Sequence, residues 1–598
     1  MSSNEKINIV GANIDEKSTV IWNVANSLFG AYKPHEYGLV VLPMAVIKRF
    51  HDCLLPTRDN VLEIYEKVKH LAVKDGFLRK ASGYRFYNTS NYTFEKLKAD
   101  PENIKANFED YINGFSDNVI DILANMGFYT QIERMSDAGV LYQVISDFCD
   151  DKADMSPDHI SAVDMGYIFE NLVQRFSESY DEEAGAHFTS RDIIYLMCDL
   201  LTTDANLSDE NAPAKTVYDM AMGTSQMLTC MEERIKALDR NAEIICYGQE
   251  INPFTFGIAK ADMLIRGGDP DNMQFGNTLN DDKFSGYTFD YCISNPPFGI
   301  DWKREAADIE AEHKKGDAGR FGVGLPAKSD GQMLFMLNGL SKLKDTGRMA
   351  IIQNGSSLST GDAGSGQSEI RRYLIENDWL DAIIQLPNDS FYNTGIATYI
   401  WIITKEKPES HREQVLLIDA SLCYEQRRKS IGSKRVDITD NCRDMIVKAY
   451  GEYCTKNYTR KMAEGKELIC KSKVLDAVSL GYNKIIVENP ELDENGNPIK
   501  KGKKLVADKS KRDTESVPLD EDIDTYFERE VLPYRPNAWI DRNKTKVGYV
   551  IPFTRTFYEY KELEPAADIA KRIEEHEHSM MQKLHELFGN GGEQNECI

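Results

Sequence analysis

Seven short apolar segments lie between residues 216 and 419, with helix-forming sequence between them. They are rich in β-branched and aromatic residues, as is typical of buried strands. The segments are 216–218, 243–247, 289–294, 349–353, 382–386, 398–404 and 415–419. Strands that alternate with helices in this way predict an α/β fold built on a mostly parallel, doubly wound sheet.

The sequence on either side of this region has a different character. Residues 1–155 carry long apolar segments separated by polar turns, which predicts a helical N-terminal domain. We assign 156–425 to the α/β catalytic domain, 426–530 to a charged insert or extension, and 531–598 to a C-terminal region that contacts a partner. That region is expected to end in an amphipathic helix over 566–588, whose apolar stripe packs either on its own domain, the commoner case, or on a partner.

A turn of unusual chemistry follows the third apolar segment. It reads Asn295-Pro296-Pro297-Phe298. The Asn295 side-chain carbonyl and the Pro296 main-chain carbonyl can both accept hydrogen bonds from an –NH2 group, and the two prolines fix the backbone before a substrate arrives. Phe298 can stack on a planar ring, a contact worth ~1–3 kcal/mol per nucleic-acid base. The turn therefore predicts a site for a planar ring that carries an exocyclic amine.

Residues that could bind a second ligand lie near the ends of the neighbouring predicted strands. Asp219 and Gly223 come after the first segment, Glu250 after the second, and Asn277 lies before the third. Ligands of open α/β sheets bind at the carboxyl ends of the strands, where a carboxylate can accept from the hydroxyls of a ribose. Each residue alone is more often a cap or a turn residue. Their order along the chain is what favours a binding site.

Several other classes of site lack support in the sequence. Neither a Gly-x-Gly-x-x-Gly motif nor a phosphate-binding Gly-x-x-x-x-Gly-Lys-Ser/Thr motif is present. The 11 cysteines are scattered without a Cys-x-x-Cys pair, which predicts reduced thiols and no metal site. No signal peptide or membrane-spanning apolar run occurs, so we expect a cytoplasmic protein that does not enter a membrane.

The net charge of −25 bears on the choice of partner. Binding to nucleic acid draws most of its non-specific affinity from basic residues that contact phosphates. Either the basic residues of this chain gather on one face, or a basic partner holds the nucleic acid. The composition leads us to favour a partner.

Together these motifs resemble those of the N6-adenine DNA methyltransferases, and in particular the modification subunit of type I restriction-modification systems. The resemblance rests on the block 185–191 (Gly-Ala-His-Phe-Thr-Ser-Arg), the strand-end groups above, the Asn295 turn, residues 22–50 and the late motif 391–398. It implies a methyltransferase that moves a methyl group from S-adenosylmethionine to the N6 amine of adenine in double-stranded DNA. The choice of adenine over cytosine rests on the resemblance alone.

The resemblance also implies roles for individual residues. Catalysis falls to Asn295, Pro296, Pro297 and Phe298. Contacts with the cofactor fall to His187, Phe188, Thr189, Asp219, Gly223, Thr224, Ser225, Glu250 and Asn277. A separate specificity subunit, which holds two modification subunits, is the implied partner, and a nuclease subunit is a further one.

The chain departs from the family pattern at four places. Met220 follows the strand-end acid where proline is usual, Ser225 and Gln226 stand where glycines are common, Ser190 replaces a proline, and Asn277 replaces an aspartate. Side chains at 225 and 226 change the surface that meets the cofactor. Two alternatives therefore stay open: a protein-glutamine methyltransferase, which uses a similar turn on a side-chain amide, and a non-catalytic scaffold with a degenerate cofactor site.

Overall fold

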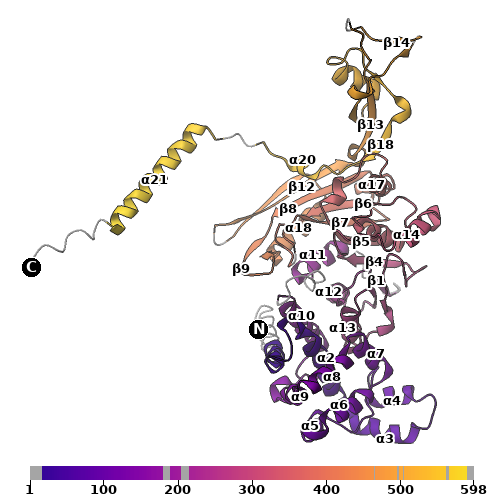
Figure 1. The fold of residues 1–598 in the computed structure, drawn as a ribbon, viewed down its shortest axis with the longest axis vertical. Coiled ribbons are helices and arrows are strands. Elements are labelled where there is room, and N and C mark those ends of the chain that lie inside the picture. Colours follow the sequence, from indigo (N-terminus) through magenta and orange to yellow (C-terminus); the bar gives the residue numbers. More distant parts are fainter. Residues whose placement is uncertain are drawn as a thin grey trace, which may run out of the picture. The chain divides into compact units, whose positions relative to one another are not determined.

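The computed structural model describes residues 17–178, 189–203, 214–392, 394–462, 465–494, 497–502, 504–560 and 564–588. The chain divides into two compact units, Met1–Ile551 and Pro552–Ile598. Each unit is described by itself. Figure 1 labels the helices and strands of both units.

A ten-stranded sheet forms the centre of the first unit, in the order β11-β12-β8-β6-β7-β5-β4-β1-β2-β3. Its first strands are β1 (Lys215–Asp219), β2 (Ile244–Glu250), β3 (Met273–Phe275), β4 (Phe289–Ser294) and β5 (Leu343–Asn354). These five strands are parallel. All of the strands predicted from the apolar segments are present, and the short strand β3 is an addition.

The other half of the sheet mixes strand directions. It contains β6 (Leu380–Gln385), β7 (Thr398–Thr404), β8 (Gln414–Leu422), β11 (Lys456–Lys461) and β12 (Glu467–Asp476). Strand β7 runs antiparallel between β5 and β6, and β8 is parallel to β6. Strands β12 and β11 then add antiparallel pairings at the edge. The expectation of a mostly parallel sheet therefore describes the β1–β5 half alone.

Helices cover both faces of this sheet, as expected for a doubly wound fold. On one face, α11 (Arg191–Thr202), α12 (Gln226–Leu238) and α18 (Asp440–Glu452) bury apolar side chains against the strands. Helix α15 (Gln332–Ser341) packs on the other face, so closely that a Cβ at Gly339 would lie 2.4 Å from Met349 Sδ. Helices α14 (Ala306–His313), α16 (Ser356–Ser359) and α17 (Gly366–Glu376) complete this region.

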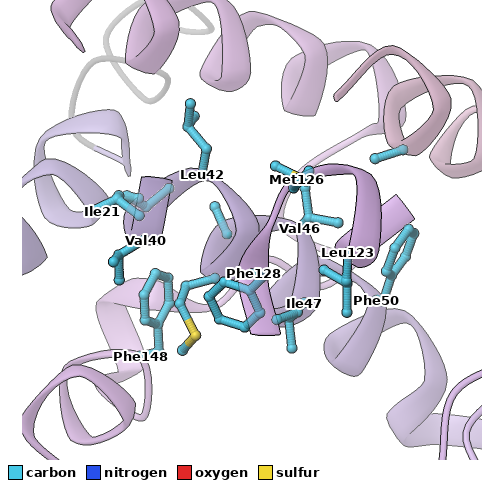
Figure 2. Close-up of a cluster of buried hydrophobic side chains, with 14 of the residues drawn as sticks. Ile21, Val40, Leu42, Val46, Ile47, Phe50, Leu123, Met126, Phe128 and Phe148 are labelled. Carbon is cyan, nitrogen blue, oxygen red and sulfur yellow. The ribbon is translucent and has the colours of Figure 1, made fainter. Parts of the chain in front are cut away.

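The N-terminal region is helical, as predicted, and is built around one buried helix. Every residue of α2 (Gly38–Leu54) except Leu39 is buried, and its buried charged residues Lys48 and Asp52 pair with each other. Figure 2 shows part of this core, with side chains from α2 beside Leu123, Met126 and Phe128. The surrounding helices are α3 (Arg58–Val68), α4 (Asp75–Ser82), α5 (Phe94–Lys98), α6 (Ile104–Asn113), α7 (Asp117–Asn125), α8 (Phe128–Asp137), α9 (Leu141–Asp147) and α10 (Ala162–Glu178).

The helical core does not end at the expected boundary near residue 155. Ile258, Ala261, Leu264 and Ile265 of α13 (Pro253–Ile265) belong to the same buried cluster. Helix α13 follows β2 in the catalytic domain, so its apolar side chains join the two regions through a shared core.

The segment expected as a single charged insert, 426–530, is divided between two structures. Strands β11 and β12 extend the central sheet, and β9 (Glu425–Ile431) and β10 (Lys434–Asp437) form a hairpin. Residues 481–549 instead build a second sheet from β13 (Gly481–Glu488), β16 (Asp513–Pro518), β17 (Trp539–Ile540) and β18 (Lys546–Tyr549). This sheet has a small core of its own: Ile485, Val487, Val517, Phe527 and Val531. Strands β14 (Lys500–Lys501) and β15 (Lys504–Leu505) and helix α19 (Ile523–Tyr526) lie within this segment.

The second unit contains α20 (Phe553–Phe557) and α21 (Ala566–Phe588), the helix predicted over the same residues. The apolar stripe of α21 is exposed, with Ile573 57% and Leu587 75% accessible. Across the described residues, no helix combines the length and the apolar character that a membrane span needs.

Candidate active site

Four strand ends bring the predicted site residues together. Strands β3, β2, β1 and β4 are parallel neighbours, so their carboxyl ends meet at one edge of the sheet. The groups that follow them, Asn277, Glu250, Asp219 and Asn295, therefore stand side by side. A cavity at this edge is lined by Gly223, Glu250, Asn277, Asn295, Pro297 and Glu305, among others.

Asp219 is a buried carboxylate that ties two strands together. It is 1% exposed, and its Oδ1 accepts from the Ser294 hydroxyl at 2.7 Å and from the Ala221 N–H at 3.0 Å. Burial raises its pKa to about 7, against the lowering effect of these two hydrogen bonds. Ser294 directly precedes the Asn295-Pro296-Pro297-Phe298 turn, so Asp219 fixes the point where that turn leaves β4.

Glu250 holds the glycine turn after β1. Its Oε2 accepts from the Gly223 N–H at 2.8 Å, and its Oε1 accepts from the Asn252 N–H at 2.8 Å. Gly223 has a φ of 53°, a left-handed conformation that glycine adopts without strain. Each carboxylate oxygen has a second lone pair, so Glu250 can still accept from two hydroxyls of a ligand in the cavity.

Ser225 occupies a backbone position that favours glycine. Its φ is 66°, it is completely buried, and it is the N-terminal cap residue of α12. Its hydroxyl has no hydrogen-bond partner among the described residues. Ser225 therefore has the left-handed backbone conformation that favours glycine, although it carries a side chain.

Asn277 is already engaged within the protein. Its Oδ1 accepts from the Leu279 N–H at 3.0 Å, and its Nδ2 donates to Glu305 Oε1 at 3.1 Å. The Asn277 amide therefore presents little free hydrogen-bonding capacity to the cavity. Glu305, at the start of α14, thus brings a carboxylate beside Asn277 at the cavity. Glu305 lies 28 residues from Asn277, and no sequence pattern pointed to it.

Arg320 stabilises the loop that carries Asn277. Its guanidinium donates to the carbonyls of Thr278 at 2.7 Å and Leu279 at 3.1 Å, and to Glu312 Oε2 at 2.7 Å. The Thr278 hydroxyl donates to the Met220 carbonyl at 2.6 Å. These contacts join the loops after β1 and β3 into one wall of the cavity, and no sequence motif signals them.

The side-chain amide of Asn295 is oriented by a residue from another segment. Its Nδ2 donates to Thr189 Oγ1 at 2.8 Å. Its Oδ1 is buried and has no hydrogen-bond partner among the described residues. Leaving a buried acceptor unpaired costs about 1–3 kcal/mol, so Oδ1 keeps the capacity to accept from a further donor.

The remaining predicted residues are placed as follows. Pro297 lines the cavity and Pro296 is buried. Phe298 is half-buried and packs against the sheet core, and it is not among the residues that line the cavity. Thr224 lines a separate small cleft between α10, α12 and α13. His187 and Phe188 lie outside the described residues, and Thr189 contacts Asn295.

The chain matches two family models. The model of the N-6 DNA Methylase family matches residues 161–484, and the HsdM N-terminal domain model matches residues 18–148. The second match covers most of the helical region around α2.

Similar proteins are known in archaea and bacteria. The methylase subunit of the type I restriction enzyme MjaIX of Methanocaldococcus jannaschii is 29% identical over 44% of this chain and 46% of its own length. The methylase subunit of HindI from Haemophilus influenzae is 29% identical over 44% of this chain and 56% of its own. The chain thus spans about half the length of the curated relatives it matches.

A solved structure shares the fold. The methyltransferase subunit of a type I restriction-modification system from Streptococcus thermophilus is 19% identical, with a TM-score of 0.60 over 78% of this chain and 97% of that one. This confirms the expected fold class, a methyltransferase-type doubly wound sheet with a helical N-terminal region. Because the N-6 DNA Methylase model covers more than half of the sequence, this chain belongs to the N-6 DNA methylase family.

Proposed function

We propose that this chain transfers a methyl group from S-adenosylmethionine to the N6 amine of adenine in double-stranded DNA, as the modification subunit of a type I restriction-modification complex. The observation that carries the proposal is the Asn295 side chain. Its Nδ2 is committed to Thr189, which leaves Oδ1 as a buried acceptor with no donor among the described residues. An exocyclic amine is a donor of the right kind.

The cofactor half of the site fits the family's ligand. Glu250 can accept from ribose hydroxyls, and Gly223 lets a ligand approach the backbone. Glu305 supplies a carboxylate that can accept from an adenine amine, with Asn277 as the residue that orients it. When bound, S-adenosylmethionine supplies an electrophilic methyl group on a positively charged sulfur.

On the substrate side, the turn acts through hydrogen bonds. Asn295 Oδ1 and the Pro296 carbonyl accept from the amine, which raises electron density on its nitrogen as positive charge develops there. Thr189 is a positioning residue, because it decides which end of the Asn295 amide faces the amine. Phe298 stacks on the base after a side-chain movement away from the sheet core. A base within a duplex must rotate out of the stack to reach this edge of the sheet.

The partner is a specificity subunit that holds two copies of this chain and chooses the DNA sequence, with a nuclease subunit as a further member of the complex. The relatives of this chain are named as methylase subunits of type I restriction enzymes. The exposed apolar stripe of α21 and the helical N-terminal region are the surfaces we assign to contact with the specificity subunit. The protein acts in the cytoplasm, where its DNA substrate lies.

The test compares Asn295→Ala with Asn280→Ala, an exposed asparagine that contacts Asp308 near the same cavity. Labelled methyl transfer to DNA should fall about 100- to 1,000-fold in Asn295→Ala, as for the loss of one preorganised catalytic contact, and should persist in Asn280→Ala. Cofactor binding, measured by calorimetry, should be retained in both. Near-normal transfer by Asn295→Ala would contradict the assigned role.

The same assay separates the two alternatives. Label that enters a co-purifying protein and not DNA would identify a protein methyltransferase. Failure to bind S-adenosylmethionine at millimolar concentration would identify a scaffold. In Thr189→Val the amide loses its anchor, so transfer should fall by less than in Asn295→Ala, with cofactor binding again retained.

A further inference from the structure

The β9–β10 hairpin is a basic element in an acidic protein. Residues 425–437 carry five basic and two acidic side chains, in a chain whose net charge is −25. Arg428, Lys429 and Arg435 are exposed, and none of them has a salt bridge to any residue that the structure describes. Arg427, by contrast, is paired with Asp437. The hairpin therefore presents three uncompensated positive charges to solvent.

The hairpin stands at the same edge of the sheet as the catalytic turn. Strand β8 is parallel to β6, and β6 and β5 both run antiparallel to β7, so β4, β5, β6 and β8 all end at one edge. Glu425 begins the hairpin three residues after β8 ends. The cofactor groups follow β1, β2 and β3, whereas the hairpin lies on the opposite side of β4, beyond the strands β5, β7 and β6.

Buried contacts tie the hairpin to the catalytic turn. Lys434, with 1% of its side chain exposed, donates to Asp192 Oδ2 at 2.9 Å, and the Ile438 N–H donates to the same oxygen at 2.8 Å. Asp192 lies three residues after Thr189, a backbone span of at most about 11 Å. Thr189 in turn accepts from Asn295.

The loop after β6 also holds the hairpin. The Ser433 N–H donates to the Tyr392 carbonyl at 2.8 Å, and the Arg435 N–H donates to the Asp389 carbonyl at 2.9 Å. Lys434 Nζ donates to the Ser390 carbonyl at 3.0 Å. These contacts anchor β10 and the turn before it, and β9 pairs with β10, so the hairpin offers its exposed cations from a fixed position.

The turn between β11 and β12 adds to this basic surface. Lys466 Nζ lies 4.1 Å from the centre of the Tyr424 ring, at the base of the hairpin. Arg460 and Lys461, at the end of β11, are exposed. Strand β11 is parallel to β8, because both pair antiparallel to β12, so its end reaches the same edge.

We propose that the β9–β10 hairpin, with Arg428, Lys429 and Arg435 as its contact residues, grips phosphates of the DNA backbone beside the target base. The inference rests on the proposed function, because it takes DNA as the substrate. Three cations fixed on the substrate side of the catalytic turn match the spaced negative charges of a duplex. The chain thus carries a DNA contact of its own, in addition to those of a specificity subunit.

The other lysine-rich segment is a poorer candidate. Residues 488–515 contain seven basic and seven acidic side chains, so their charges balance. Lys511 pairs with Asp508, and Arg512 pairs with Glu488. This segment provides a matched control for the test.

The experiment measures binding of the full chain to a 30-base-pair duplex by fluorescence anisotropy over a series of salt concentrations. The variant carries Arg428→Glu, Lys429→Glu and Arg435→Glu, and the control carries Lys500→Glu, Lys501→Glu and Lys509→Glu. Each phosphate contact contributes about 0.9 to the slope of log affinity against log salt. The hairpin variant should lose about 2–3 from that slope and about 10- to 100-fold in affinity at low salt, and the control should change little.

A second variant carries glutamine in place of glutamate at Arg428, Lys429 and Arg435. If its thermal unfolding midpoint equals that of the wild type, a loss of DNA binding is not caused by misfolding. Equal slopes in the hairpin variant and the wild type overturn the proposal, as does a wild-type chain that does not bind the duplex at low salt. A loss of partner binding with an unchanged slope overturns it in favour of a protein contact. If the slope falls as expected but no DNA is methylated, the proposed function fails and the hairpin contact stands.

Discussion

At the scale of single residues, the direction of one amide decides what the site can do. Asn295 keeps its Oδ1 as an unpaired acceptor because Thr189, 106 residues earlier, accepts from its –NH2 group. With the amide reversed, the unpaired group would be a donor, and the side chain could not accept from an amine. Asp219 adds a second constraint, because it holds Ser294 at the start of the same turn.

The raised pKa of Asp219 predicts a pH dependence of stability. In the unfolded chain this carboxyl titrates at the ordinary aspartate pKa of 3.8, and in the folded chain its pKa is about 7. The folded state is therefore favoured below pH 4, and this contribution is lost as the pH rises through 7, with a slope of at most about 1.4 kcal/mol per pH unit. Thermal unfolding measured between pH 5 and 8 should show this loss of stability in the wild type and not in Asp219→Asn.

Asp290 provides the control for that measurement. Burial acts to raise its pKa, but hydrogen bonds from Lys344 and Thr216 outweigh burial and lower it, so its contribution has the opposite sign. Asp290→Asn should therefore leave the decline between pH 5 and 7 in place. An unchanged decline in Asp219→Asn would contradict the assignment to Asp219.

Ser225 predicts a stabilising substitution. A non-glycine residue in the left-handed region costs about 1–2 kcal/mol, which is partly offset by the entropy that glycine gains in the unfolded chain. Ser225→Gly should therefore raise the free energy of unfolding by about 1 kcal/mol. Ser225→Ala separates the two causes, because it removes the unpaired hydroxyl but keeps the Cβ at a φ of 66°. Equal gains in both variants would show that backbone strain is not the cause.

At the scale of elements, one buried arginine joins three parts of the first unit. Arg371 of α17 donates to the carbonyls of Tyr549 at 2.7 Å, Ser357 at 3.0 Å and Thr360 at 3.0 Å. These carbonyls belong to β18, to α16 and to the loop that follows it. Burial lowers the pKa of Arg371 to about 10. The second sheet is thus fastened to the catalytic domain beside the end of β5.

Replacing Arg371 should loosen that junction. Arg371→Leu leaves three buried carbonyls without their donor, at a cost of about 1–3 kcal/mol for each unsatisfied group, and we expect a total loss of about 3–5 kcal/mol. Unfolding in urea, followed by limited proteolysis, should show earlier cleavage within 481–549. Arg372→Leu, in a side chain with salt bridges to Glu369 and Glu376, is the matched control and should change stability by about 0.5 kcal/mol or less.

At the scale of the whole molecule, the second unit carries the apolar stripe of α21. The apolar side chains of α21 are exposed, and such a stripe is typical of a helix that binds in a groove of another protein. Deleting 566–598 should leave cofactor binding unchanged and abolish co-purification with the specificity subunit.

A finer variant tests the stripe itself. Ile573→Glu with Leu584→Glu places two charges on the apolar face, and Lys571→Glu with Gln582→Glu places them on the opposite face. The first pair should abolish assembly and the second should preserve it. Intact assembly after deletion or after the first pair would contradict the proposed contact.

The sequence by itself determined which strand ends carry the polar groups of the site. Asp219, Glu250 and Asn295 each stand at the end of a strand that the sequence predicts, and because parallel strands end at a common edge, their convergence could be predicted without coordinates. Asn277 follows β3, a strand that the sequence did not reveal. The N-terminal helical region and α21 could also be predicted, because the apolar periodicity of a helix is a local property of the sequence. The antiparallel direction of β7 could not be predicted from the sequence. The direction of a strand depends on its neighbours in the sheet, and its own residues do not encode it.

The tertiary structure alone decided the contacts between distant segments. It placed Thr189 on Asn295, Glu305 on Asn277, and Lys434 on Asp192, and so linked the basic hairpin to the Asn295 turn through residues 189–192. It also made 481–549 a sheet with its own core, where a charged sequence had predicted an insert. The physical reason is the same in each case: a hydrogen bond or ion pair between residues far apart in the chain depends on the packing of the elements that carry them, and local sequence does not record that packing.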